Sequence, residues 1–128
     1  MDSSQASRVG LARYEYDFAV HGGTAGAIVV GAGRMPAGAV VIDGIILIVT
    51  AIVGTTSTLA IHITGAGDVL AATAEASLTV GLLVDTVCDG AAANCIEVAA
   101  GAGCTFTIAV NDLTAGKVVV GLRYIEMS

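Results

Sequence analysis

The sequence is poor in charge, in aromatic residues and in proline. Only 12% of its 128 residues are charged and 4% are aromatic, tryptophan is absent, and proline occurs once. The cations are scattered along the chain, and the formal net charge is −6. They are Arg8, Arg13, Arg34, Lys117 and Arg123. Proteins that bind nucleic acid directly need cations clustered against the phosphates, so this role is not expected here.

The chain also lacks a run long enough to predict a membrane-spanning helix. Its strongest apolar run, residues 45–53, is far shorter than the about 20 residues that cross a bilayer, and residues 54–58 interrupt it. The first residues have no basic start followed by an apolar core, so we expect no secretory signal and folding in a cytoplasm. The three cysteines, an odd number, do not form a closed disulfide framework.

What the chain has in abundance is small and β-branched apolar residues. The apolar fraction is 55%, and there are 17 glycines. Val, Ile and Thr favour pleated strands, glycine favours frequent turns, and a chain of this length is typical of one domain with its own core. A surface with so little charge also predicts contact with other proteins.

The strongest local pattern lies in residues 40–64. Two β-branched runs, 45–53 and 58–64, flank the connector 54–57, which predicts a hairpin. The first run is apolar at odd and even positions alike, whereas a half-exposed strand alternates apolar with polar residues. We therefore expect this strand to be covered on both faces, by a second sheet and by a neighbouring subunit.

The rest of the chain predicts further short strands separated by turns. Residues 13–20 alternate, with Tyr14, Tyr16, Phe18 and Val20 on one face, which predicts a half-buried strand. Other predicted strands cover residues 27–30, 39–42, 80–88, 95–99, 104–110 and 117–125. Of these, 80–88 and 95–99 are expected to form a second hairpin.

Together these elements predict an all-β fold. Asp43 and Gly44 favour a turn or bulge, and Asp68 is expected to cap a short helical turn over residues 69–73. The pattern indicates an antiparallel β-sandwich of eight or nine short strands with at most one short helical turn, and the jelly roll is a candidate topology. Residues 1–12 are expected to form an N-terminal arm and 13–128 a single β-sandwich domain.

No motif predicts a catalytic, cofactor or metal site. Residues 29–33 resemble the start of a dinucleotide-binding fingerprint, but Pro36 stands at its third glycine and a strand pattern follows instead of a helix. His21 and His62 have no acidic, cysteine or histidine partners at the spacings that metal binding or proton transfer requires. We therefore expect no enzymatic activity and no cofactor.

Two cysteines flank the loop of the second predicted hairpin. Cys88 and Cys95 would face each other if the two strands pair directly, and a disulfide would then close a small loop. The alternative is that both are reduced apolar side chains, which folding in a cytoplasm favours. Cys104 lies on the apolar face of its strand and is expected in the core.

The order of several segments resembles that of a known family. A YEYDFAV strand is followed by an MPAGAVV loop, an apolar stretch, the connector GDVLAATAEASL and the segment FTIAVNDLTAGKVVV. Over residues 13–125 this arrangement resembles the capsid decoration, or cement, proteins of tailed bacteriophages. The resemblance implies a β-sandwich that binds the outside of the head as a homotrimer, bridges major capsid protein subunits and is part of the virion, after synthesis in the host bacterial cytoplasm.

The apolar faces, and the preference of tyrosine for interfaces, predict which surfaces meet neighbouring subunits. The candidates for an oligomer or capsid interface are Tyr14, Tyr16, Ile46, Ile48, Ile52 and Tyr124. Other functions stay open at this point: another virion component, such as a tail tube or the base of a head fibre, or a carbohydrate-binding β-sandwich. The absence of tryptophan argues against the last of these.

Overall fold

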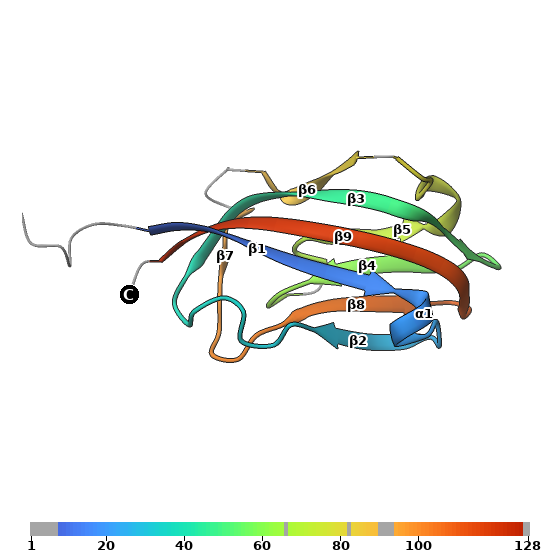
Figure 1. The fold of residues 1–128 in the computed structure, drawn as a ribbon, viewed down its shortest axis with the longest axis horizontal. Coiled ribbons are helices and arrows are strands. Elements are labelled where there is room, and N and C mark those ends of the chain that lie inside the picture. The colour runs from blue at the N-terminus through green and yellow to red at the C-terminus, as the bar shows by residue number, and fades with distance from the viewer. Residues whose placement is uncertain (1–7, 66, 82, 90–93, 127–128) are drawn as a thin grey trace, which may run out of the picture.

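The computed structural model describes residues 8–65, 67–81, 83–89 and 94–126. Within these ranges antiparallel strands form two stacked sheets that enclose one core, which confirms the predicted all-β sandwich (Figure 1). The strands are β1 (Arg8–Asp17), β2 (Gly26–Val30), β3 (Val40–Gly54), β4 (Thr58–His62), β5 (Leu70–Ala74), β6 (Leu83–Asp89), β7 (Ile96–Glu97), β8 (Cys104–Ala109) and β9 (Leu113–Glu126). One α-helical turn, α1 (Phe18–His21), follows β1, and a 3₁₀ turn, η2 (Glu75–Ser77), follows β5.

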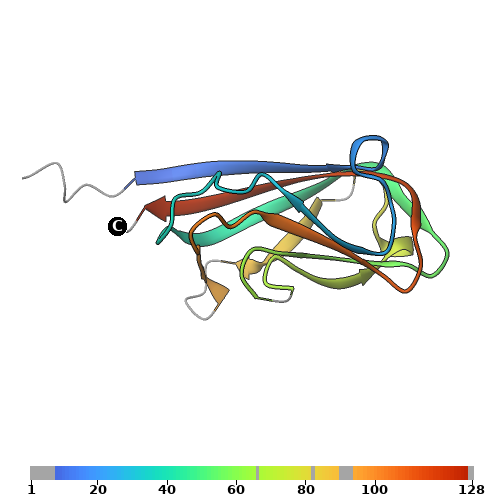
Figure 2. The ribbon, with the colours of Figure 1, turned by 90° about the horizontal axis from the view of Figure 1, so that it is seen from below.

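The strand order is that of a jelly roll. One sheet runs β1-β9-β3-β6, with β7 also paired to β3, and the other runs β2-β8-β4-β5. Strands from the two ends of the chain thus pair in nested order: β1 with β9, β2 with β8, β3 with β6, and β4 with β5. Figure 2 shows the two layers edge on. This nesting is the double-sheet jelly roll named as a candidate topology.

The core is filled by alternate residues of each strand, because successive side chains point to opposite faces of a sheet. On β9, Val118, Val120 and Leu122 are fully buried. From the other sheet, the ring of Phe106 lies 5.7 Å from that of Tyr16 on β1, which joins the two layers. The period-two pattern of the sequence therefore decides which side chains form the core.

Both predicted hairpins are wrong. β3 and β4 belong to different sheets, because the connector crosses from one layer to the other. Ser57, fully buried in this connector, donates a hydrogen bond from Oγ to the carbonyl of Asn111 (2.9 Å), which holds the crossing in place. β6 and β7 do not pair directly in the observed ladders; they pair one after the other with the long strand β3.

The first predicted strand, 13–20, is shifted toward the N-terminus. β1 begins at Arg8, within the range predicted as an arm, and residues 1–7 lie outside the described part of the chain. It ends at Asp17, because the Asp17 carboxylate accepts a hydrogen bond from the amide of Ala19 (3.0 Å) and caps α1. Val20 is consequently 74% exposed and does not share the buried face of Tyr14 and Tyr16.

The helical turn predicted over residues 69–73 is also wrong, because β5 begins at Leu70. The Asp68 carboxylate instead accepts three backbone hydrogen bonds, from the amides of Ile63 (2.8 Å), Thr64 (3.0 Å) and Gly65 (2.7 Å). These bonds fold the loop between β4 and β5 around a single side chain. The predicted irregularity at Asp43 is confirmed by a register shift between β3 and β6.

Candidate functional site

The outer face of the five-stranded sheet carries a group of exposed aliphatic side chains. We call it the aliphatic face and define it by the exposed residues Val9, Leu11, Ile45, Leu47 and Val49 and by the half-buried Val119 of β9. Leu11 is 74% exposed and Ile45 is 53% exposed. A Cβ atom on Gly121 would lie 3.8 Å from Leu11 Cδ1 and 3.7 Å from Ile45 Cγ1, so these two side chains flank a shallow dent at Gly121.

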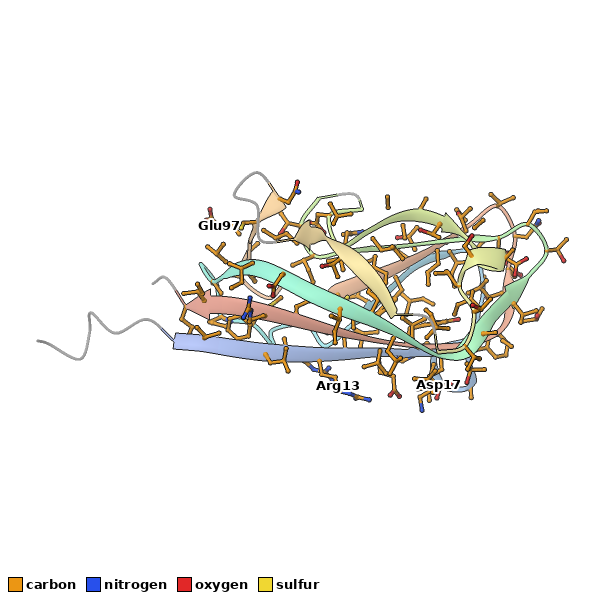
Figure 3. The ribbon with its side chains drawn as sticks, turned by 90° about the horizontal axis from the view of Figure 1, so that it is seen from above. Arg13, Asp17 and Glu97 are labelled. Carbon is orange, nitrogen blue, oxygen red and sulfur yellow. The ribbon has the colours of Figure 1, made fainter. Side chains whose placement is uncertain are left out.

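Ion pairs lie among these aliphatic side chains. Arg123 on β9 binds the carboxylate of Asp43 on β3 through two nitrogens, at 2.9 and 2.5 Å. Glu15 on β1 is paired with Arg13 (3.0 Å) and with Lys117 on β9 (3.8 Å). Figure 3 shows Arg13 and Asp17 on the side of β1 that faces away from the second sheet, whereas Glu97, a residue of β7, lies far from them. Exposed pairs of this kind add little stability.

Five of the six residues predicted to form an interface lie in the core, which corrects that prediction. Their exposed fractions are 2% or less: Tyr14, Tyr16, Ile46, Ile48 and Ile52. A partner that docks on the outside of the folded chain cannot contact them, since they point toward the second sheet. The sixth residue, Tyr124, is partly buried, and its ring covers Gly10 opposite it on β1.

The sequence did contain the signal for the aliphatic face. In residues 45–53 the odd and the even positions are both mostly apolar; the structure exposes Ile45, Leu47 and Val49 and buries Ile46, Ile48 and Ile52. Leu11 was missed because residues 1–12 were assigned to an arm. Extending the alternation of Tyr14 and Tyr16 back to Ala12, which is also buried, would have placed Leu11 on the outer face.

A second unusual feature lies inside the sandwich, where Tyr14 and Cys104 are both fully buried. Burial raises the pKa of Tyr14 to about 12, with a further contribution from Cys104. Burial likewise raises the pKa of the Cys104 thiol to about 12. The Tyr14 hydroxyl has no hydrogen-bond partner among the described residues, although the Arg34 guanidinium lies 5.3 Å from the centre of its ring. Cys104 is in the core as expected.

Removing the Tyr14 hydroxyl is expected to stabilise the protein. An unsatisfied buried hydroxyl costs about 1–3 kcal/mol, so Tyr14→Phe should raise the free energy of unfolding by about 1 kcal/mol. Tyr16→Phe is the matched control with the opposite sign, because the Tyr16 hydroxyl donates a 2.6 Å hydrogen bond to the carbonyl of Gly22. Urea denaturation of the two variants measures both effects, and a destabilised Tyr14→Phe protein would contradict the prediction.

The histidines have structural contacts. His21 Nδ1 accepts a hydrogen bond from the Asp17 amide (3.1 Å), and its ring stacks on Tyr16 with a centroid distance of 5.9 Å. His62 is half-buried on β4, opposite Thr105 of β8. In the part of the chain that the structure describes, no three His, Cys, Asp or Glu side chains gather as a metal site. No helix within the same residues is long and apolar enough to cross a membrane.

An open hollow of about 320 Å³ lies where β6, β7 and the loop around Asp68 meet. Its lining includes Asp68, Cys95 and Glu97. Both carboxylate oxygens of Asp68 accept backbone hydrogen bonds, so this group holds the loop together. The side chain of Cys88 lies outside the described residues, and its disulfide with Cys95 stays a prediction.

Comparisons with known proteins were made by sequence and by structure. No family model and no curated protein sequence matches the chain. Its fold is similar to a chain of the cyanophage Pam1 capsid asymmetric unit, with a TM-score of 0.64 and 22% identity over 98% of this chain and 96% of that one. A chain from the capsid of Ralstonia phage GP4 gives a TM-score of 0.68 and 18% identity over 94% and 86%.

A third similar chain comes from the acidic stable capsid structure of Helicobacter pylori bacteriophage KHP30. Its TM-score is 0.62, and 15% of residues are identical over 96% of this chain and 95% of that one. At these identities the three comparisons show a shared fold, and the coverage extends over nearly the full length of both chains.

Proposed function

We propose that this chain is a structural virion protein that binds the outer surface of a phage head and stabilises contacts between major capsid protein subunits. The observation that carries the proposal is the shared jelly roll, aligned over 94–98% of the chain with chains of three phage capsid structures. The resemblance to capsid decoration proteins over residues 13–125 supports the same role independently.

The lengths of the matched chains favour a small capsid component. Since 96% of the Pam1 chain and 95% of the KHP30 chain align with this one, those chains are about as long as the 128 residues here. A protein of this size with one rigid core suits the role of a subunit that is added to a shell. The partners in this proposal are the major capsid protein and further copies of the chain, as a homotrimer of about 38 kDa, three times 12.6 kDa.

The charged side chains fit this role better than a catalytic one. Glu15, Asp43 and Asp68 form ion pairs or backbone hydrogen bonds with their own chain. Proton transfer in a catalytic site needs such groups to converge on a substrate. The proposal therefore assigns the function to surfaces and needs neither a cofactor nor a reaction.

Locating the chain in virus particles tests the proposal. Antibodies raised against the purified protein would be applied, with gold labelling, to particles of the virus that encodes it. We expect label over the head surface, and we expect particles without the protein to release DNA at a lower temperature. Label on tails would identify a tail component instead, and intact particles free of the protein would overturn the proposal.

A further inference from the structure

We propose that Arg34 shields the free edge of β1 and so keeps this strand from pairing with strands of other chains. This role goes beyond the proposed function, because it concerns an association that the fold prevents. Three features point to it: the place of β1 in its sheet, the side chains that bond its free edge, and the contacts that hold Arg34 there.

β1 is the longest strand at the border of a sheet. It has 10 residues, whereas β6, β2 and β5 at the other borders have 7, 5 and 5. In the ladders between described residues it pairs with β9, and Figure 1 shows it at the border of its sheet. A long free edge offers unpaired N–H and C=O groups to any other strand, so soluble proteins protect such edges.

Side chains bond backbone groups of β1 from outside the sheet at two places. The Arg34 guanidinium donates a hydrogen bond to the carbonyl of Arg13, and His21 Nδ1 accepts one from the amide of Asp17 (3.1 Å). The N–H and C=O of a strand residue point to the same side, and that side alternates along the strand. Because β1 pairs with β9 without a register shift, its odd-numbered residues direct their backbone groups to the free edge.

These two contacts divide the free edge into short pieces. Among the described residues, 9–11 have no observed backbone partner at this edge, and Glu15 lies between the two contacts. A strand that pairs with residues 9–11 is shorter than the usual strand of about 5–6 residues. Without Arg34 the open stretch would extend over residues 9–15, which is enough for a complete strand.

Several contacts hold Arg34 in this position. Its amide donates a hydrogen bond to the carbonyl of Gly31 (3.1 Å), and the next residue, Met35, is 1% exposed. The guanidinium carbon lies 5.3 Å from the centre of the Tyr14 ring, a cation–π contact. A Cβ atom on Gly31 would lie 2.7 Å from Arg34 Nε, so the glycine leaves the space that this side chain occupies. Because the side chain is already restricted, its bond to the Arg13 carbonyl costs little further conformational entropy.

The test compares the self-association of the wild-type chain, Arg34→Ala and Arg123→Ala. Arg123 is the matched control, because it is also an exposed arginine but lies on β9, inside the sheet, where it binds Asp43. Each substitution removes one positive charge from a chain of net charge −6, which increases the repulsion between copies. Stronger association is therefore not explained by the change in charge. Sedimentation velocity at increasing protein concentration measures the mass, and circular dichroism with urea denaturation shows that each variant is folded.

We expect the wild-type chain and Arg123→Ala to keep one mass as the concentration rises. Arg34→Ala should form larger species, with an association constant at least about 10-fold higher. Arg34→Met, which keeps a long side chain over Tyr14 but has no donor, should behave in the same way. Adding Leu11→Pro to Arg34→Ala should restore the wild-type mass, because proline removes an N–H that faces the free edge and leaves the bonds to β9 in place.

Amide hydrogen exchange tests the mechanism residue by residue. In the wild-type chain the amides of Leu11 and Arg13 should exchange faster than those of Gly10 and Ala12, which face β9. In the larger species formed by Arg34→Ala, the amides of Leu11 and Arg13 should become protected. Loss of protection at Gly10 and Ala12 would mean that β1 has left its sheet, and this would reject the proposed role.

Three further results would overturn the inference: folded Arg34→Ala and Arg34→Met proteins that keep the wild-type mass, larger species formed equally by Arg123→Ala, or larger species that Leu11→Pro does not prevent. Lower stability of Arg34→Ala without association would show that Arg34 only fastens its own loop. These measurements need no phage head, so this inference and the proposed function can fail independently.

Discussion

Asp68→Ala should lower the free energy of unfolding by about 3 kcal/mol, because it removes three charge-assisted hydrogen bonds at once. The carboxylate accepts these bonds from consecutive amides, those of Ile63, Thr64 and Gly65. Ile63 is only 6% exposed, so water compensates poorly for the bond to its amide. The shift in the midpoint of urea denaturation measures the loss.

Two further variants separate the contribution of Asp68 from the general effect of removing an acidic group. Asp112→Ala removes a carboxylate that accepts one bond, from the exposed amide of Ala25 (2.8 Å), and should cost about 1 kcal/mol or less. Asp68→Asn keeps one acceptor oxygen and should fall between the two alanine variants. If Asp68→Ala unfolds at the same urea concentration as Asp112→Ala, the loop does not depend on this carboxylate.

Alkaline solution should weaken the fold from about pH 9 upward. In the folded chain the Cys104 thiol and the Tyr14 hydroxyl both have a pKa of about 12, against ordinary values of 9.0 and 10.0. Above these ordinary values the unfolded chain loses protons that the folded chain keeps, so the free energy of unfolding decreases as pH rises. Each group lowers it by at most about 1.4 kcal/mol per pH unit, which amounts to several kcal/mol near pH 12.

Measuring the denaturation midpoint between pH 8 and pH 11 tests this expectation, and the two groups can be told apart by where their effects begin. Cys104→Ala should remove the loss that starts near pH 9. Tyr14→Phe should leave that loss and reduce the decline above pH 10. Variants whose midpoints fall with pH as steeply as that of the wild-type chain would show that neither group is responsible.

The sequence predicted the strands better than their pairing. Alternation along β1, β8 and β9 identifies the buried side chains Tyr14, Phe106 and Val120, because the period of two is a property of each strand alone. Pairing depends on contacts between distant segments. For example, the hydrogen bond from Ser57 to the carbonyl of Asn111 holds the connector that leads to β4 in the second sheet. These two residues are far apart in the sequence, and no local pattern predicts their contact.

The position of the aliphatic face could not be predicted from the sequence. A run that is apolar on both faces shows that one face lies outside the chain's own core, but the run does not say which one. Which face of β3 turns inward depends on its pairing with β9 in the sheet. In that sheet Ile46 and Ile48 lie against the second sheet, and Ile45 and Leu47 lie on the outside. The lack of a hydrogen-bond partner for the buried Tyr14 hydroxyl could not be predicted either, since it depends on which groups pack around it in three dimensions.

The position of β9 also constrains how the protein is made. β9 lies between β1 and β3 in the five-stranded sheet, yet residues 113–126 are the last of the described strands to leave the ribosome. Until then β1 has no strand beside it in that sheet, and β3 lacks its neighbour on one side. Pairing between such distant segments is slow, so the nascent chain spends its synthesis with unpaired, aggregation-prone strands. Completion of this sheet therefore has to wait until residues 113–126 have been synthesised, and a chain that stops before residue 113 cannot form it.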